Sequence, residues 1–159
     1  MYHYRPGKQM NYMMLEVPAR SENESFVRVV IAAFAARLDP TLEEINEVKT
    51  AVSEAVTNSI LHAYDDDQGL IKIKAFVEDN VEDKKLWIEI SDTGKGIADI
   101  AKAREPLYTD KPELERSGMG FTIMENFMDE VEVNSSPGKG TVVKMLKVFN
   151  KDKVAESSH

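Results

Sequence analysis

The 159-residue sequence contains no cysteine, and this absence excludes several kinds of chemistry. The chain can form no disulfide, no thiolate metal site and no thiol nucleophile. The longest apolar run, around residues 29–36, falls far short of the roughly 20 residues that a membrane-spanning helix needs. The first ten residues lack the apolar stretch of a secretory signal. We therefore expect a cytoplasmic protein that does not insert into a membrane.

Basic residues are too few for a typical nucleic-acid binder. Lysine and arginine number 20 against 28 aspartate and glutamate, which gives a net charge of −8. A nucleic-acid-binding surface normally requires a basic face or stripe. The three histidines, His3, His62 and His159, are scattered singly and do not form a metal-binding cluster. These features predict partners that are proteins or small molecules, with no direct nucleic-acid contact.

The length fits one domain. We expect the folded domain at residues 10–149, after an N-terminal extension at 1–9 and before a flexible tail at 150–159. Asp39-Pro40 separates two predicted helices: Ser21 and Asn23 offer N-caps for the first, and Thr41 with Glu44 forms a capping box for the second.

Apolar periodicity predicts the remaining elements. In the first helix the residues at helical spacing are Phe26, Val29, Val30, Ala33, Phe34 and Leu38. In the second, the apolar stripe on one side is Ile45, Val48, Val52, Val56 and Ile60. The spacing indicates an α/β (α+β) two-layer sandwich with a mixed, mostly antiparallel sheet and helices on one face. The predicted strands cover residues 11–17, 70–77, 86–90, 131–134 and 141–148, and the predicted helices cover 21–38, 41–63 and 121–128.

Glu54 and Asn58 stand four residues apart on the second predicted helix, so both project from one face. A carboxylate beside an amide oxygen can activate a hydroxyl and hold a magnesium ion. A solvated helix face would carry the same residue types. The spacing alone leaves both interpretations open.

Two glycine loops offer ligand contacts. The first, Asp92-Thr93-Gly94-Lys95-Gly96, follows a strand; its glycines permit close backbone approach, and its carboxylate can accept a hydrogen bond from an exocyclic amine. The second, Gly118-Met119-Gly120, opens a helix, where backbone N–H groups favour an anion, and Lys111 and Arg116 could add bonds to phosphate. An ordinary turn and an ordinary helix cap remain alternatives.

Other nucleotide motifs are missing. The sequence has no P-loop, no complete dinucleotide fingerprint and no eukaryote-type kinase loops.

Four elements occur in register: Glu54-x-x-x-Asn58, Asp92-x-Gly94-x-Gly96, Gly118-x-Gly120 and Gly140-Thr141. In this order they resemble the GHKL superfamily of ATPases and kinases, with its Bergerat-type ATP-binding fold. Residues 52–58 and 111–129 are also similar to the anti-sigma kinases of that superfamily, which are serine protein kinases of endospore-forming bacteria. The resemblance covers roughly residues 11–148.

The resemblance implies a role for each matching residue. Glu54 would be the catalytic base, Asn58 would coordinate Mg²⁺, and Asp92 would bind the adenine amino group of ATP or ADP, with Thr141 nearby. The remaining nucleotide contacts would come from Gly94, Gly96, Lys111, Arg116, Ser117, Gly118, Met119, Gly120 and Phe121.

The resemblance also implies partners. Such proteins form homodimers, bind a sporulation sigma factor (sigma factor F) and phosphorylate a serine of an anti-anti-sigma factor; Arg28 would lie on the partner-binding surface. A stress-response anti-sigma kinase of the same family is the nearest alternative. A sensor histidine kinase is disfavoured because His62 lies inside the nucleotide helix. A non-catalytic, ATP-switched binding module is disfavoured because it needs no base at Glu54.

Overall fold

The computed structural model describes residues 10–63, 69–80, 82–96 and 120–149. One sheet holds the strands in the order β1-β2-β3-β5-β4. The strands are β1 (Asn11–Pro18), β2 (Leu70–Asp79), β3 (Lys84–Asp92), β4 (Glu130–Ser136) and β5 (Gly140–Val148). Every described pairing is antiparallel, so the expectation of a mixed sheet was wrong on this point, while the two-layer α/β sandwich is confirmed.

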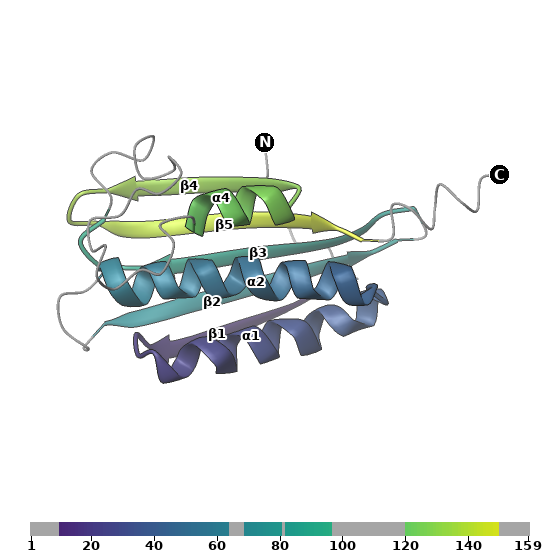
Figure 1. The fold of residues 1–159 in the computed structure, drawn as a ribbon, viewed down its shortest axis with the longest axis horizontal. Coiled ribbons are helices and arrows are strands. Elements are labelled where there is room, and N and C mark those ends of the chain that lie inside the picture. Colours follow the sequence, from purple (N-terminus) through teal and green to yellow (C-terminus); the bar gives the residue numbers. More distant parts are fainter. Residues whose placement is uncertain (1–9, 64–68, 81, 97–119, 150–159) are drawn as a thin grey trace.

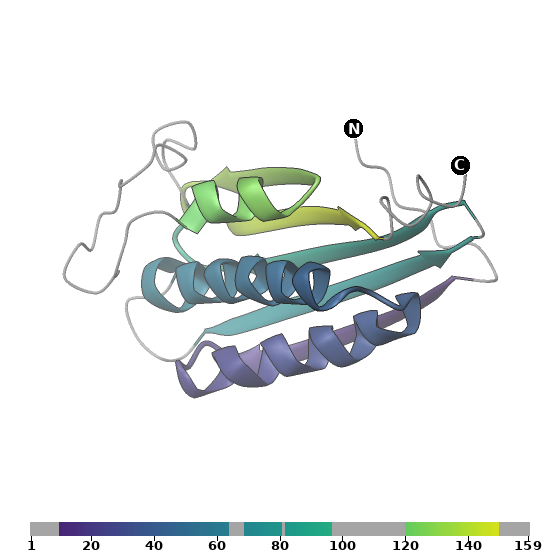
Figure 2. The same ribbon diagram turned by 45° about the vertical axis from the view of Figure 1, so that its right-hand side comes forward.

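The helices form the second layer, on one face of the sheet (Figures 1 and 2). They are α1 (Glu22–Ala35), α2 (Leu42–Asn58) and α4 (Gly120–Phe127). A short 3-10 helix, η1 (Ala36–Leu38), follows α1, and a π-helical turn, η2 (Ser59–Ala63), continues α2. No helix in the described part of the chain is long and apolar enough to cross a membrane.

The core lies between α2 and the middle of the sheet. The predicted stripe of α2 is confirmed, since Val48, Val52 and Val56 are fully buried. Alternation along each strand sends every second side chain toward the helices. On β2 and β3 the buried residues on this face are Ile71, Ile73, Ala75, Val77, Leu86, Ile88 and Ile90.

The start of α1 differs from the prediction in two ways. Ser21 occupies the N-cap position but makes no capping hydrogen bond, and the Asn23 amide instead donates to the Pro18 carbonyl at 2.8 Å. Phe26 and Val29, which the helical spacing assigned to the apolar face, are 51% and 60% exposed. The helix has apolar residues on two sides, and the sheet covers only one of them.

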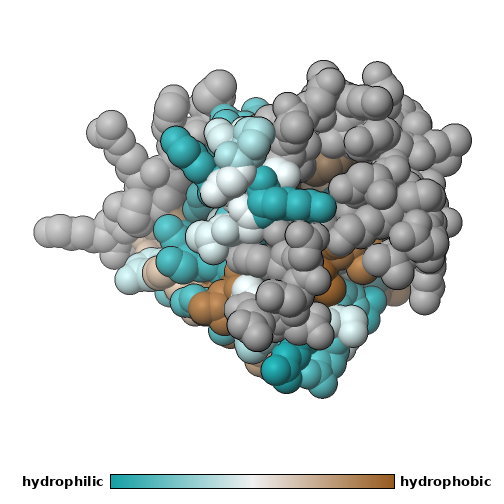
Figure 3. All heavy atoms as spheres, turned by 90° about the vertical axis from the view of Figure 1, so that its left-hand side faces the viewer, coloured by the Kyte–Doolittle hydropathy of each residue, from teal (hydrophilic) through white to brown (hydrophobic). Residues whose placement is uncertain are grey.

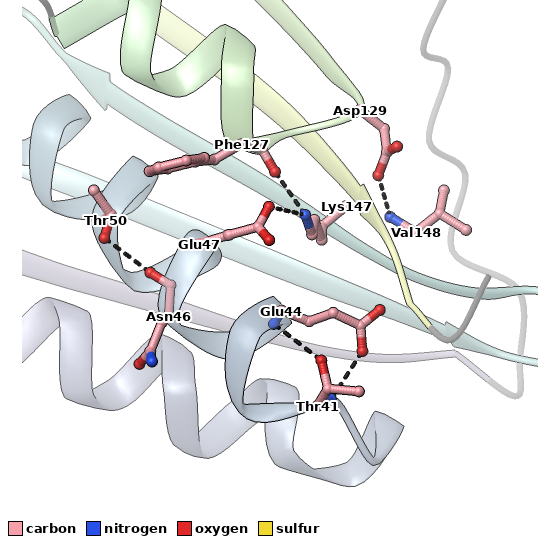
Figure 4. A network of polar contacts seen from close by, with 9 residues as sticks. All are labelled: Thr41, Glu44, Asn46, Glu47, Thr50, Phe127, Asp129, Lys147 and Val148. Atoms are coloured by element: carbon pink, nitrogen blue, oxygen red, sulfur yellow. Dashed lines mark hydrogen bonds and ion pairs between the residues drawn. The ribbon is translucent and has the colours of Figure 1, made fainter. Parts of the chain in front are cut away.

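The capping box of α2 is confirmed. Thr41 Oγ1 accepts a hydrogen bond from the Glu44 backbone at 3.1 Å, and the Thr41 backbone donates to Glu44 Oε1 at 2.8 Å (Figure 4). Two of the donors that a helix leaves unpaired at its first turn are thereby satisfied.

A buried lysine joins helices α2 and α4 to the sheet (Figure 4). Lys147, on β5, is only 8% exposed. Its ammonium donates to Glu47 Oε2 of α2 at 2.9 Å and to the Phe127 carbonyl, at the end of α4, at 2.6 Å. A buried ammonium needs such partners because burial removes its hydration. Lys147 therefore holds α4 against α2 and β5.

We expect Lys147→Ala to lower the free energy of unfolding by about 2–3 kcal/mol. Removing one member of a fully buried pair costs about 3–5 kcal/mol, and Glu47 is partly exposed, which reduces the figure. Urea denaturation followed by circular dichroism measures the change. Lys139→Ala, in the exposed β4–β5 turn, is the matched control, with an expected change within about 0.5 kcal/mol. Equal stability of the two variants would contradict the anchoring role.

Candidate functional site

The motif residues that the structure describes gather at one end of the sandwich. The C-terminal end of α2, the C-terminal end of β3 and the beginning of α4 meet there, at the left of Figure 1. Figure 3 views the molecule onto this end, where hydrophilic and hydrophobic described residues both reach the surface. Segments from three distant parts of the sequence thus supply one site.

Glu54 and Asn58 lie against the first residue of α4. Both side chains are partly buried on the same face of α2, as their spacing predicted. A Cβ atom added to Gly120 would stand 3.1 Å from Asn58 Nδ2 and 3.4 Å from Glu54 Oε2. The side-chain-free backbone of Gly120 is therefore what allows the helix start to approach these two polar groups.

The chemistry of this cluster suits a metal-bound anion. The amide oxygen of Asn58 and the carboxylate of Glu54 are hard oxygen donors of the kind that Mg²⁺ prefers. Gly120 begins a helix, where backbone N–H groups have no partner within the helix. A group that pairs Mg²⁺ with phosphate oxygens fits this donor set, with Asn58 as the residue that would hold the metal.

Asp92 ends β3 as a buried carboxylate, 7% exposed. Ser59 Oγ, in the first residue of η2, donates to Asp92 Oδ2 at 3.0 Å, and the Gly94 backbone donates to Oδ1 at 3.0 Å. The π-helical turn begins one residue after Asn58, so the hydrogen bond from Ser59 ties Asp92 directly to the Glu54–Asn58 face. Such turns are frequent at functional sites.

The pKa of Asp92 is raised above its ordinary value of 3.8. Burial is the main cause, because it disfavours the charged form. Hydrogen bonds from the Gly94 backbone, the Ser59 hydroxyl and the Thr141 backbone oppose the rise. A buried carboxylate with donors already arranged around it is a common feature of ligand sites.

The first glycine loop packs against the β4–β5 turn. The Gly138 backbone donates to the Lys95 carbonyl at 2.7 Å. Gly96 has a positive φ of 77°, and a Cβ there would overlap the Ser136 carbonyl. Gly140 has a φ of 89°, and a Cβ there would overlap the carbonyl of Asp92. These two glycines are required by the close approach of two loops, whatever ligand the site takes.

Thr141 stands directly across from Asp92 on β5, and Ser135 of β4 stands across from Thr141. The two hydroxyl oxygens are 2.8 Å apart, and Ser135 Oγ also lies 3.0 Å from the Gly140 carbonyl. Asp92, Thr141 and Ser135 thus form one polar row across three strands, on the helix-facing side of the sheet.

The structure brings together part of the predicted set. Glu54, Asn58 and Gly120 form one cluster, and Asp92, Gly94 and Thr141 form the other. The Phe121 side chain packs in the hydrophobic core, so only its backbone could face a ligand. The other predicted phosphate contacts, Lys111, Arg116, Ser117, Gly118 and Met119, lie outside the described residues.

Two residues of the site escaped the sequence analysis. Ser59 directly follows Asn58, but nothing in the sequence predicts the π-helical turn that directs its hydroxyl to Asp92. Ser135 could have been found by aligning the hairpin around the Pro137–Lys139 turn, which places it opposite Thr141.

Comparison with known proteins relates the chain to one family. Residues 17–147 match the family model of the histidine kinase-like ATPase domain. The chain is 58% identical to a protein of Thermoanaerobacter called anti-sigma F factor, over 90% of this chain and 97% of that one. Proteins of the same name from Clostridium acetobutylicum (58% identity, 87% and 94% covered) and Geobacillus kaustophilus (57%, 90% and 96%) are similar.

Solved structures share the fold. The RsbU and RsbW domains of a Mycobacterium tuberculosis protein align with a TM-score of 0.63 at 17% identity, over 88% of this chain and 33% of that one. The histidine kinase domain of a blue-light activated kinase from Erythrobacter litoralis aligns with a TM-score of 0.54 at 18% identity, over 87% of this chain and 64% of that one.

The raised pKa of Asp92 predicts a pH dependence of stability. The folded protein binds this proton more tightly than the unfolded chain, so the associated stability is present below pH 3.8 and is lost as the pH rises through the folded value. As the pH rises from 3.8 through the pKa of folded Asp92, we expect the free energy of unfolding of the wild type to fall relative to that of Asp92→Asn. At neutral pH the two free energies should change in parallel.

Urea titrations of both nucleotide-free proteins at a series of pH values measure this difference. Parallel curves through the acidic window, or a relative gain by the wild type, would contradict the raised pKa.

Proposed function

The chain belongs to the histidine kinase-like ATPase domain family and resembles its anti-sigma F factors over most of its length, and we propose that it is an ATP-dependent anti-sigma factor and protein serine kinase. One observation carries the enzymatic part: Gly120, at the start of α4, lies against both Glu54 and Asn58. A carboxylate, a metal-binding amide and a phosphate-binding helix start are the parts that phosphoryl transfer to a hydroxyl requires.

Each residue has a distinct task in this proposal. Asn58 would hold Mg²⁺ through its amide oxygen. Glu54 Oε2 accepts the proton of the attacking serine hydroxyl, and Glu54 is partly buried, which limits competing water. Gly120 offers its backbone N–H to a phosphate oxygen. Mg²⁺ held by Asn58 would neutralise charge on the phosphates.

Asp92 and Thr141 hold the base of the nucleotide. The Asp92 carboxylate accepts a hydrogen bond from the exocyclic amine of adenine. Ser59 keeps that carboxylate in place. Gly94, whose backbone also contacts Asp92, and Gly96 contribute the adjoining loop. We further propose phosphate contacts from Lys111, Arg116, Ser117, Gly118 and Met119.

The outer side of α1 is the proposed surface for protein partners, namely sigma factor F and an anti-anti-sigma factor. Arg28 lies there, 3.6 Å from Glu24 across one helical turn. Arg28 Nε and Glu24 Oε1 have no hydrogen-bond partner in the described part of the chain. Phe26 and Val29, on another side of the same helix, are more than half exposed. Exposed apolar side chains and an arginine on one helix are typical components of a protein interface.

The face of the sheet opposite the helices is the proposed surface for a homodimer. No described helix packs on it (Figures 1 and 2), and Tyr12 there is 56% exposed, whereas Trp87 and Leu146 are only 8% and 6% exposed. An apolar row crosses four strands there, and a neighbouring row alternates in charge. The two rows are Tyr12–Phe76–Trp87–Leu146 and Lys74–Glu89–Lys144–Glu132. A two-fold-related copy that reverses the second row pairs each lysine with a glutamate, so the face is self-complementary.

We expect Glu54→Gln to bind ATP with an affinity close to that of the wild type and to lose phosphoryl transfer by about 10²–10⁴-fold, because the amide cannot accept the proton. Incubation with γ-labelled Mg·ATP and a candidate anti-anti-sigma protein measures the transfer.

The control variant Glu43→Gln makes the same chemical change on the exposed first turn of α2, and it should still transfer the label to the partner serine. ATP binding without transfer by the wild type would favour the non-catalytic module. Label on a histidine would indicate a histidine kinase.

Arg28→Ala should weaken binding of the sigma factor or the anti-anti-sigma factor by about tenfold or more, because arginines at interface centres commonly contribute over 1 kcal/mol. Its stability should change by about 1 kcal/mol or less, since the ion pair with Glu24 is long at 3.6 Å and makes no hydrogen bond within the described residues, although it is partly buried. Titration calorimetry with each partner measures the effect. Arg37→Ala, beyond the end of α1, is the control. Equal partner affinities of the two variants would show that the partner surface does not include Arg28.

A further inference from the structure

The hydroxyl of Ser135 contacts two acceptors but has only one proton. The Gly140 carbonyl, 3.0 Å away, can only accept, so this bond takes the Ser135 proton. The bond to Thr141 Oγ1, 2.8 Å long, must then use the proton of Thr141. Counting protons therefore fixes the direction of both bonds: Thr141 donates to Ser135, and Ser135 donates to Gly140.

This direction leaves Thr141 with lone pairs only for any ligand. Thr141 shares the helix-facing side of the sheet with Asp92, its direct neighbour across the strands. Its side chain is partly exposed, whereas Val143 and Met145 further along the same face are buried in the core. The hydroxyl therefore borders the site as an acceptor.

Asp92 presents acceptors as well. A carboxylate has about four lone-pair positions. Three are used, by the hydroxyl of Ser59, the backbone of Gly94 and the backbone of Thr141. The remaining capacity is again that of an acceptor.

We propose that Ser135 is a specificity-determining residue: by taking the proton of Thr141, it makes the Asp92–Thr141 row accept hydrogen bonds only, so that the site selects a purine with an amino group at position 6 and rejects one with a carbonyl. This inference rests on the proposed nucleotide site. Adenine carries an amine at that position, whereas guanine and hypoxanthine carry an oxygen. Two acceptors facing a carbonyl oxygen leave buried polar groups unpaired, which is how such sites discriminate strongly.

Titration calorimetry with adenosine diphosphate and inosine diphosphate tests the proposal, because the two bases differ at position 6 and the adjoining ring nitrogen. We expect the wild type to prefer the adenine nucleotide by roughly 100-fold. In Ser135→Ala the hydroxyl of Thr141 is free to rotate and donate to a carbonyl. The preference should then narrow by about tenfold, mainly through tighter binding of inosine diphosphate.

Two further variants separate this role from a structural one. Ser135→Thr keeps the hydroxyl and should restore the wild-type preference. Ser91→Ala removes a hydroxyl from the residue next to Asp92, on the opposite face of the sheet, and should leave the preference unchanged. Thermal unfolding of each variant confirms that it is folded, and Ser135→Cys replaces Ser135→Ala if the latter is not.

The outcomes are distinct. A wild type that binds neither nucleotide overturns the proposed nucleotide site, and this inference with it. A wild type that binds both equally, or a Ser135→Ala variant with unchanged preference, overturns the role of Ser135 and leaves the proposed function in place.

Discussion

Packing of α2 against the middle of the sheet determines both the core and the site. Val48, Val52 and Val56 bury one side of the helix, and this fixes its rotation about its own axis. Because Glu54 and Asn58 occupy the adjoining face, the same rotation directs them toward the start of α4. Lys147 then limits where α4 can lie, through its bonds to Glu47 and to the end of α4. Hydrophobic burial thereby positions polar groups that do not themselves contribute to the core.

This arrangement buries the carboxylate of Asp92 at an unfavourable free energy. The carboxylate at the end of β3 loses hydration, and this loss raises its pKa. Three donors, including Ser59, compensate for part of it and hold the carboxylate in one orientation. A group that is unfavourable for folding but has an ordered hydrogen-bond environment is better explained by ligand recognition than by stability.

Different surfaces of the sandwich are available for different tasks. The end of the sheet carries the proposed nucleotide site, α1 carries Arg28, and the sheet face opposite the helices carries the row that begins at the exposed Tyr12. Phe26 and Val29 illustrate why sequence periodicity misleads here. A helix with apolar residues on two sides satisfies the same spacing rule whichever side is buried, and an exposed apolar surface is what a protein partner would cover.

The sequence by itself determined the element order, the capping box at Thr41, the stripe of α2 and the shared face of Glu54 and Asn58, because all of these depend on neighbours within a few residues. The resemblance to a known superfamily also came from the sequence, because the order and spacing of the motifs can be read without a structure. Only the tertiary structure decided that Gly120 meets Glu54, that Ser59 bonds to Asp92 and that Ser135 takes the proton of Thr141. Those contacts depend on a π-helical turn, on strand register and on the docking of α4, which arise from packing between segments far apart in the chain.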